Sequence, residues 1–282
     1  MADRTDLTLM AVHAHPDDES SSTGGILARY SDEGVTTVLV TCTNGEYGDG
    51  PGHVKPGEDG HEPDTVAKTR LGELDVACDH LGVTHSVRLG YHDSGMPDWE
   101  FRDHDHVFCN VPLEESVGRL VALVEQFRPQ VMVTYDDNGG YNHPDHLQAH
   151  RIAVEAFRRT GIPDKLYLIA RRRRDWTQLR ERMQAAGIEM PTPAQPQRQP
   201  DPEVVKRLEE REAMITTEVD VSAVVDRKRL ALAAHASQLD ESWWMRFPPD
   251  AFAEFFGNET FIRLEDRTGA PVPEDDLFAG LR

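Results

Sequence analysis

Short apolar runs alternate with amphipathic segments through the first half of the chain. Four apolar runs are too short for helices and predict buried strands, at residues 7–12, 35–42, 86–90 and 130–135. Hydrophobic residues between the runs recur at helical spacing, which predicts helices over 17–33, 65–82 and 113–129. Alternating strands and helices are typical of a parallel sheet with right-handed crossovers. The pattern therefore predicts an α/β, Rossmann-like fold with helices flanking a mostly parallel sheet.

The second half of the chain has a less regular pattern. Its expected elements are a strand at 165–170, helices at 175–187 and 220–238, and an edge strand at 259–265. A proline-rich stretch at 190–202 predicts an extended connector. We expect residues 1–170 to form the α/β core that carries the functional site. Residues 171–282 should complete the same domain as a smaller C-terminal extension that covers this site.

The charge balance narrows the range of partners. Thirty basic and 50 acidic side chains give a formal charge of −20, which disfavours binding to nucleic acid or to an anionic membrane surface. One run of arginines, at 171–174, is a candidate anion site, although a solvated cluster fits it better. The three cysteines are widely spaced and indicate neither a disulfide framework nor a thiolate zinc site.

No stretch of the sequence reaches 18 apolar residues, so none is long enough to predict a membrane-spanning helix. We expect a cytoplasmic protein with a small-molecule substrate, and the sequence leaves a homo-oligomer open.

The sequence His-Pro-Asp occurs twice, each time after a predicted strand. It begins at His15 and again at His143. Proline favours an extended residue before it and is well tolerated at the first position of a helix. Each histidine should therefore lie at a strand-to-helix corner, and in a parallel sheet these corners share the edge where sites form. Histidine and aspartate side chains from two distant segments are thus expected to meet.

Imidazole and carboxylate groups without a thiolate favour a catalytic zinc ion or a related divalent metal. Three protein ligands leave one position for water, whose pKa falls to about 7 on such a metal. A neighbouring carboxylate can then take the proton. Acids in the first turn after His15 are also what a helix dipole favours without any metal. The repetition of the motif favours the metal site.

These motifs carry a family resemblance. AHPDD at 14–18 and HPDH at 143–146 resemble the LmbE-like, or PIG-L, deacetylase family, and TCTNGE, KTRLGEL, HDSGM and TYDDNGGYNHPDH extend the likeness over most of 7–160. That family includes N-acetylglucosaminyl-phosphatidylinositol de-N-acetylase and two mycothiol enzymes, a deacetylase and an S-conjugate amidase. The resemblance implies a zinc-dependent hydrolase that removes an acyl group, usually acetyl, from an N-acylated amino-sugar glycoside similar to acetylglucosaminyl-inositol.

The resemblance also implies roles for single residues. It implies Zn²⁺ held by His15, Asp18 and His146, a ligand set that also accepts Fe²⁺. Asp17 would be the general base that activates water. His143 would act as general acid or stabilise the oxyanion.

Further roles follow from the same likeness. Asp145 would orient the neighbouring imidazole and Tyr141 would help to bind the oxyanion. The sugar and inositol contacts of the family correspond to Arg70 and Asp93. Ser22 stands where the deacetylase has serine and the amidase has lysine, which weakens the amidase assignment.

Two other functions remain open at this stage. One is cleavage of the amide in a mycothiol S-conjugate, and the other, of a different class, is a non-catalytic metal-containing protein that binds carbohydrate. Among the remaining histidines we expect a packed polar residue at His13 and an ordinary helix-face residue at His150. The run 103–106 should be a solvated loop, and the sequence does not place His235 in the core or at the site.

Overall fold

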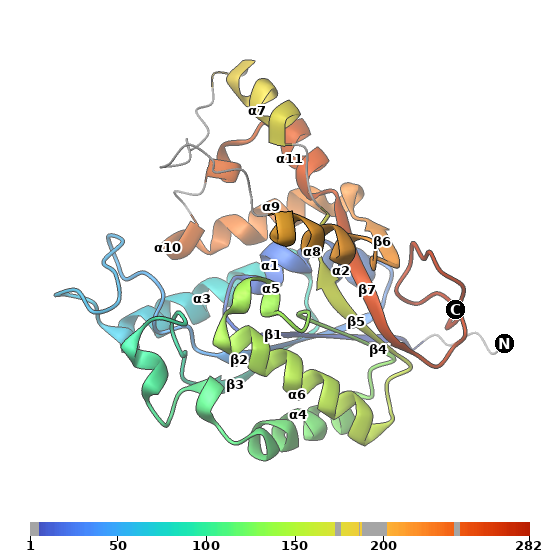
Figure 1. The fold of residues 1–282 in the computed structure, drawn as a ribbon, viewed down its shortest axis with the longest axis horizontal. Coiled ribbons are helices and arrows are strands. Elements are labelled where there is room, and N and C mark those ends of the chain that lie inside the picture. The colour runs from blue at the N-terminus through green and yellow to red at the C-terminus, as the bar shows by residue number, and fades with distance from the viewer. Residues whose placement is uncertain (1–5, 173–175, 186, 188–201, 240–242) are drawn as a thin grey trace.

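The computed structural model describes residues 6–172, 176–185, 187, 202–239 and 243–282. In these residues seven strands form one sheet in the order β3-β2-β1-β4-β5-β7-β6 (Figure 1). The strands are β1 (Thr8–His13), β2 (Thr36–Thr43), β3 (His85–Tyr91), β4 (Val131–Thr134), β5 (Lys165–Ala170), β6 (Thr217–Asp220) and β7 (Asn258–Asp266). Strands β3, β2, β1, β4 and β5 run parallel, while β7 is antiparallel to both of its neighbours, β5 and β6. The predicted α/β class and mostly parallel sheet are confirmed.

Helices cover both faces of this sheet. The helices of the core are α1 (Asp18–Ser22), α2 (Gly24–Asp32), α3 (Pro63–Leu81), α4 (Leu113–Phe127), α5 (Gly139–Asn142) and α6 (Pro144–Thr160). Those of the C-terminal part are α7 (Trp176–Ala185), α8 (Pro202–Glu212), α9 (Val225–Ala234), α10 (Ala236–Leu239) and α11 (Pro249–Phe256). Figure 1 shows α4 and α6 below the sheet and α2 and α9 above it.

The buried strands explain why the sequence shows continuous apolar runs rather than alternation. In β1, Leu9 and Ala11 belong to the core beneath α2, α3 and α9, whereas Met10 and Val12 belong to the core beneath α4 and α6. Every residue of β1 is buried. A central parallel strand is covered on both faces, so successive positions Leu9 to Val12 all carry apolar side chains.

The expected edge strand at 259–265 is an interior strand, so that prediction was wrong. Strand β7 lies between β5 and β6 and pairs with both. The edge position belongs to β6, whose four residues Thr217–Asp220 are too few and too polar to give a hydrophobic signal.

Two helices that were expected to be continuous are interrupted. The helix predicted over 17–33 is divided at Thr23, where α1 ends and α2 begins. The helix predicted over 220–238 opens with a 3₁₀ turn at Ser222–Val224 and is broken again at His235, between α9 and α10. Both interruptions lie beside the site described below, because Thr23 and His235 bond to residues there.

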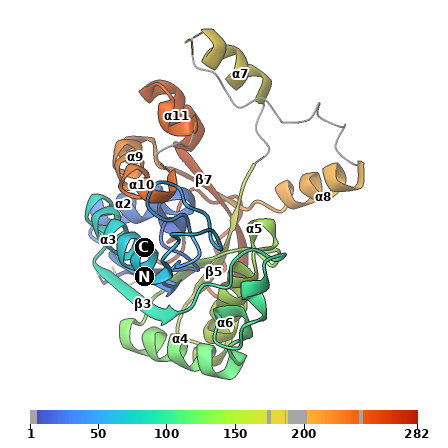
Figure 2. The same cartoon turned by 90° about the vertical axis from the view of Figure 1, so that its left-hand side faces the viewer.

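The region between 170 and 220 was only partly predictable. Helix α7 matches the helix expected at 175–187. Helix α8 was not expected, and most of the predicted connector at 190–202 lies outside the described residues, which resume at Pro202. Figure 2 shows α7 and α8 standing away from the sheet. Within the described residues, no helix combines the length and apolar character needed to cross a membrane.

Buried charges attach the last segment of the chain to the sheet. Lys165 Nζ in β5 lies 2.5 Å from Glu274 Oε1, and the Tyr167 hydroxyl donates to Glu274 Oε2 at 2.8 Å. Arg263 in β7 contacts the same carboxylate at 2.9 Å. Removing one partner of such a buried pair costs about 3–5 kcal/mol, because the remaining charge has no compensation. The residues after β7 are therefore an integral part of the sheet domain.

Candidate active site

Polar side chains gather at the carboxyl ends of the parallel strands. His15 follows β1, Glu46 follows β2, Asp93 follows β3 and Tyr135 follows β4. His146 joins them from the first turn of α6, the helix that begins after β4. This is the sheet edge at which open α/β folds place their sites. The convergence expected from the two His-Pro-Asp motifs is present.

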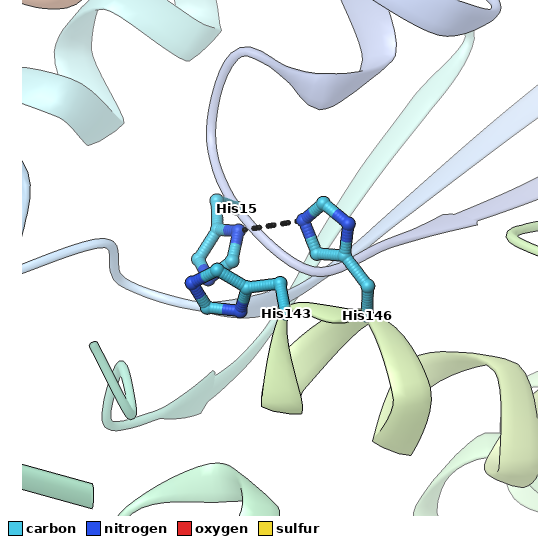
Figure 3. A group of neighbouring side chains, drawn as sticks. All are labelled: His15, His143 and His146. Carbon is cyan, nitrogen blue, oxygen red and sulfur yellow. Dashed lines mark hydrogen bonds between the residues drawn. The ribbon is translucent and has the colours of Figure 1, made fainter. Parts of the chain in front are cut away.

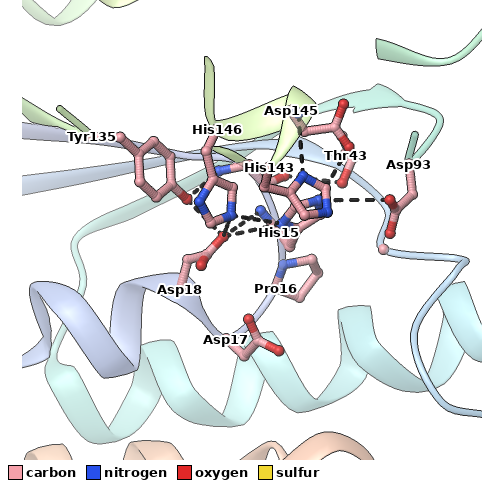
Figure 4. Close-up of polar contacts among 12 residues, drawn as sticks. His15, Pro16, Asp17, Asp18, Thr43, Asp93, Tyr135, His143, Asp145 and His146 are labelled. Carbon is pink, nitrogen blue, oxygen red and sulfur yellow. Dashed lines mark hydrogen bonds and ion pairs between the residues drawn. The ribbon is translucent and has the colours of Figure 1, made fainter. Parts of the chain in front are cut away.

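Three candidate metal ligands present donor atoms at nearly equal separations (Figure 4). His15 Nδ1 lies 3.3 Å from Asp18 Oδ2 and 3.3 Å from His146 Nε2, and His146 Nε2 lies 3.5 Å from Asp18 Oδ2. Ligands at about 2.0–2.1 Å from a tetrahedral zinc ion are separated from each other by roughly 3.3–3.4 Å. The residues present therefore fit a tetrahedral metal with one position left for another ligand.

His143 lies beside this group and completes a cluster of three imidazoles (Figure 3). Its ring centroid is 4.5 Å from that of His15 and 4.9 Å from that of His146. The backbone N–H of Asp145 donates to His143 Nδ1 at 3.2 Å, so this imidazole caps α6. Burial and the two neighbouring imidazoles lower the pKa of His143 to about 2. A second group of side chains that can hold a metal consists of His15, Asp93, His143 and Asp145.

The carboxylate of Asp145 faces His15 rather than His143. His15 Nε2 lies 3.1 Å from Asp145 Oδ2, and Ser94 donates to the same carboxylate through its backbone N–H, at 2.9 Å, and through its hydroxyl. A carboxylate on the far nitrogen is the usual partner of a metal-binding histidine, because it fixes the tautomer and the orientation of the ring. We expected Asp145 to orient His143. In the structure its backbone N–H contacts His143, whereas its carboxylate contacts His15.

Asp93 is a second acid on the far side of His15. Its Oδ1 lies 3.6 Å from His15 Nε2 and accepts the backbone N–H of Gly95 at 2.8 Å. Burial alone would raise the pKa of Asp93, but the neighbouring imidazole outweighs this effect and lowers it. Only 4% of Asp93 is exposed. In this structure the residue is better placed to support His15 than to meet a substrate hydroxyl directly.

Asp17 occupies a special backbone conformation and is held by Arg70. Its φ is +117°, which few non-glycine residues adopt. Arg70 Nη2, in α3, donates to Asp17 Oδ2 at 3.0 Å and to the Pro16 carbonyl at 2.7 Å. Figure 4 shows the Asp17 carboxylate on the far side of Pro16 from His143 and His146. Burial raises the pKa of Asp17, although the Arg70 guanidinium acts against it.

Arg70 is therefore a buried neighbour of Asp17 and not an exposed substrate contact in this structure. Only 5% of its surface is exposed, and its Nη1 donates to the carbonyl of Gly45 at 2.7 Å. A planar guanidinium with several fixed acceptors holds the loop after β2 and the corner after β1 together.

Tyr141 is exposed to solvent and Ser22 is partly exposed. Tyr141 is 58% exposed, and its ring centroid lies 5.0 Å from that of His146. It sits in the kink of α5, where Gly139 and Gly140 adopt φ values of +58° and +72° that favour glycine. Partial desolvation and the nearby charge of Asp18 raise the pKa of Tyr141 to about 12, although more than half of the residue is exposed. Ser22, at the end of α1, accepts a hydrogen bond from Arg171 Nη2 at 3.3 Å.

Sequence reasoning missed several residues that hold the site together. Tyr135 donates its hydroxyl to Asp18 Oδ2 at 2.6 Å. Glu19 accepts the backbone N–H of Asp17 at 3.0 Å and lies 2.8 Å from His235 Nε2. Both partners of this Glu19–His235 pair are fully buried. Tyr135 lies in the quoted TYDDNGGYNHPDH motif, but nothing in the sequence distinguishes a tyrosine at a strand end from a core residue.

The remaining histidines are placed as follows. His13 is buried and bonds to Thr23 Oγ1 at 2.8 Å, which confirms a packed polar residue. His150 Nδ1 lies 2.8 Å from the carbonyl oxygen of Tyr135. Residues 103–106 are exposed, as expected for a solvated loop. Among the described residues, each group of side chains able to hold a metal includes His15, so all of them lie at this edge of the sheet.

Comparison with known proteins now adds the family. The family model PIG-L, described as GlcNAc-PI de-N-acetylase, matches residues 10–157. A 1D-myo-inositol 2-acetamido-2-deoxy-alpha-D-glucopyranoside deacetylase of Acidothermus cellulolyticus is 39% identical over 97% of this chain and 95% of that protein. The chain belongs to the PIG-L family. The expected family is thereby confirmed.

A second relative and a solved structure extend the comparison. A mycothiol S-conjugate amidase of Streptomyces coelicolor is 35% identical over 98% of this chain and 98% of that protein. The structure of N,N'-diacetylchitobiose deacetylase from Pyrococcus horikoshii shares the fold with a TM-score of 0.58 and 18% identity, over 92% of this chain and 84% of that one. The PIG-L member described here is an amide-hydrolysing enzyme of the deacetylase and amidase class.

Proposed function

We propose that this enzyme is a zinc-dependent hydrolase that removes an N-acyl group, acetyl in the first instance, from an N-acylated amino-sugar glycoside resembling acetylglucosaminyl-inositol. The observation that carries the proposal is the set of 3.3, 3.3 and 3.5 Å separations among His15 Nδ1, Asp18 Oδ2 and His146 Nε2. The substrate class rests on the deacetylase relatives, which cover nearly the whole chain. A small-molecule substrate and a cytoplasmic location belong to the same proposal.

In this proposal His15, Asp18 and His146 hold the ion. The His/Asp donor set without thiolate supports Zn²⁺, and Fe²⁺ is a chemically acceptable alternative. When bound, the metal supplies the Lewis acidity that makes a water molecule nucleophilic near neutral pH and polarises the acyl carbonyl. Asp145 keeps His15 in the tautomer whose Nδ1 faces the ion, since Asp145 Oδ2 lies 3.1 Å from the opposite nitrogen.

Three further groups would transfer protons or stabilise the oxyanion. Asp17 takes a proton from the attacking water, for which a pKa raised toward neutral pH is favourable. His143 is neutral at a pKa of about 2, so it would donate its Nε2–H to the oxyanion, or act as general acid to the departing amine only after it gains a proton during the reaction. The hydroxyl of Tyr141, with its ring 5.8 Å from that of His143, donates to the oxyanion as well. Amide cleavage needs all three tasks, because an amine is a poor leaving group until it is protonated.

The substrate contacts and the role of the C-terminal part belong to the proposal too. We propose that the sugar lies near Ser22, and that Asp93 acts on the site through His15 and Arg70 through Asp17. Residues 1–170 would then form the catalytic core, and residues 171–282 would complete the domain and cover the site. Contacts that support this division join Arg171 to Ser22 at 3.3 Å and Gln238 Oε1 to the backbone N–H of Asp49 at 3.0 Å.

Hydrolysis of the amide in a mycothiol S-conjugate is the second candidate, because the amidase relative is nearly as similar as the deacetylases. Serine at position 22 favours deacetylation. The test compares amine release from an N-acetylglucosaminyl-inositol glycoside and from a bimane S-conjugate of the thiol, using zinc-loaded enzyme. We expect the higher kcat/KM with the acetylated glycoside. A higher kcat/KM with the conjugate would transfer the assignment to the amidase, and no amine from either substrate would refute the proposal.

A further inference from the structure

We propose that Tyr135 is a positioning residue of the metal site, which sets Asp18 and His146 in their ligating arrangement before the ion binds. The inference rests on the proposed function, since it takes these two residues as metal ligands. Tyr135 directly follows β4, so it brings a strand other than β1 into contact with the ligands. Only 4% of it is exposed, so it contacts the ligands from the interior of the protein.

The hydroxyl of Tyr135 is fixed by two hydrogen bonds of opposite direction. It accepts the backbone N–H of Ala14 at 2.8 Å and donates to Asp18 Oδ2 at 2.6 Å. A phenol has a single proton to donate. Because the N–H of Ala14 approaches the oxygen as a donor, the hydroxyl proton is directed to the carboxylate of Asp18.

The acceptor of this hydrogen bond is the carboxylate oxygen that faces the imidazoles. Asp18 Oδ2 lies 3.3 Å from His15 Nδ1 and 3.5 Å from His146 Nε2. It also accepts the backbone N–H of His15 at 2.9 Å. Two donors, one after β1 and one after β4, therefore hold one oxygen in place, and the side chain of Asp18 loses its freedom to rotate away (Figure 4).

The ring of Tyr135 acts on the third candidate ligand. It lies parallel to the imidazole of His146, with centroids 4.1 Å apart and an interplanar angle of 15°. His146 Nδ1 lies 3.0 Å from the carbonyl oxygen of Gly139, which requires a proton on Nδ1 and leaves Nε2 free to bind a metal. Tyr135 thus restrains the plane of one ligand while its hydroxyl restrains another.

This arrangement predicts that the hydroxyl contributes to metal affinity. Loss of a group that supports a metal ligand typically weakens binding by about 10–100-fold. In Tyr135→Phe the stacked ring stays, while the hydrogen bond to Asp18 and the one accepted from the N–H of Ala14 are both lost. The zinc dissociation constant, measured by competition with a chelator of known affinity, should therefore rise by about 10–100-fold.

Tyr30 offers a matched control far from the ligands. Its hydroxyl donates to Asp276 Oδ1 at 2.9 Å and accepts the backbone N–H of Leu277 at 2.8 Å, so it makes the same pair of bonds in a buried setting. Tyr30→Phe should lower the melting temperature of the metal-free protein without changing the zinc dissociation constant. Thermal unfolding of both metal-free variants separates a general loss of stability from a loss of affinity.

A double variant tests whether the Tyr135 hydroxyl acts through Asp18. In an Asp18→Asn background, Tyr135→Phe should weaken zinc binding much less than it does in the unaltered protein. An unchanged zinc dissociation constant in Tyr135→Phe, or an equal loss in both backgrounds, would overturn the proposal. Tyr135 would then be an ordinary core residue. The proposed catalysis is judged separately: zinc binding that depends on Tyr135, without release of amine from any amide, would leave the positioning role intact and refute the deacetylase.

Discussion

His15 Nδ1 and His146 Nε2 lie 3.3 Å apart although 131 residues separate them in the sequence. When both rings are neutral, neither of these two nitrogens carries a proton, because Asp145 accepts the proton of His15 on Nε2 and the Gly139 carbonyl accepts that of His146 on Nδ1. Two acceptor nitrogens at this distance are stabilised by a cation between them. The pair is therefore the structural core of the proposed metal site.

Removing one of these imidazoles should remove the metal. His146→Ala deletes a ligand and leaves two, so we expect the purified variant to lose stoichiometric zinc in elemental analysis. His150→Ala is the control on the next turn of α6, because His150 contacts the Tyr135 carbonyl and no candidate ligand. Equal zinc content in His146→Ala and in the unaltered protein would refute this ligand set.

Changing the proposed base should separate chemistry from metal binding. Asp17→Asn keeps the size of the side chain but cannot accept a proton, so kcat should fall by about 10²–10⁴-fold. Zinc content should be unchanged, since Asp18 and not Asp17 faces the imidazoles. Full turnover in this variant would exclude Asp17 as the general base.

Arg70 distinguishes a residue that positions the base from one that binds substrate. Arg70→Lys keeps the charge but loses the fork that joins Asp17 to two backbone carbonyls. Misplacement of a catalytic group by about 1 Å can cost roughly 10²-fold, so we expect kcat to fall by about that factor with KM nearly unchanged. A higher KM with an unaltered kcat, from steady-state kinetics on the glycoside, would instead indicate a direct contact with the sugar.

A pH-dependent contribution to stability is expected at the end of β7. Asp266 accepts the N–H groups of Thr268 and Gly269 and the Thr268 hydroxyl. Burial by itself would raise the pKa of Asp266, but the bonds from Thr268 outweigh it and hold the pKa below its usual range. A lowered pKa gives stability that is present above the unfolded value of about 3.9 and is lost as pH falls through the lower folded value.

Urea unfolding of Asp266→Asn tests whether the contribution of Asp266 to stability falls as the pH is lowered. The free energy of unfolding should be lower than that of the unaltered protein at pH 6, and the difference should shrink toward pH 3. Asp275→Asn, at an exposed position of the same segment, should change the free energy little at pH 6. A difference for Asp266→Asn that stays constant or grows on acidification would contradict the expected shift.

The fold was largely predictable because the interior strands are buried on both faces. Such strands, including β1 and β4, have nearly continuous apolar runs, whereas a strand exposed on one face alternates between apolar and polar residues. Strand β6 escaped prediction because four residues at a sheet edge need little apolar character. The break at His235 escaped prediction because His235 contacts Glu19, 216 residues away, and local spacing cannot reveal such a contact.

The candidate ligands were predictable for a similar reason. A proline after each histidine fixes a strand-to-helix corner, and a parallel sheet brings such corners to one edge. The supporting contacts were not predictable, because they depend on side-chain direction. Asp145 faces His15 instead of the adjacent His143, and Arg70 faces Asp17 instead of open solvent. Tyr135 has no motif of its own beyond its place at the end of β4.

Anomalous diffraction at the zinc edge, from crystals of the protein as purified, tests the central claim most directly. We predict one strong peak about 2.0–2.1 Å from His15 Nδ1, Asp18 Oδ2 and His146 Nε2. A peak held instead by His143, Asp93 and Asp145 would move the metal to the neighbouring group. Zinc-replete crystals with no peak at either place would contradict the account of this enzyme as a metal-dependent hydrolase.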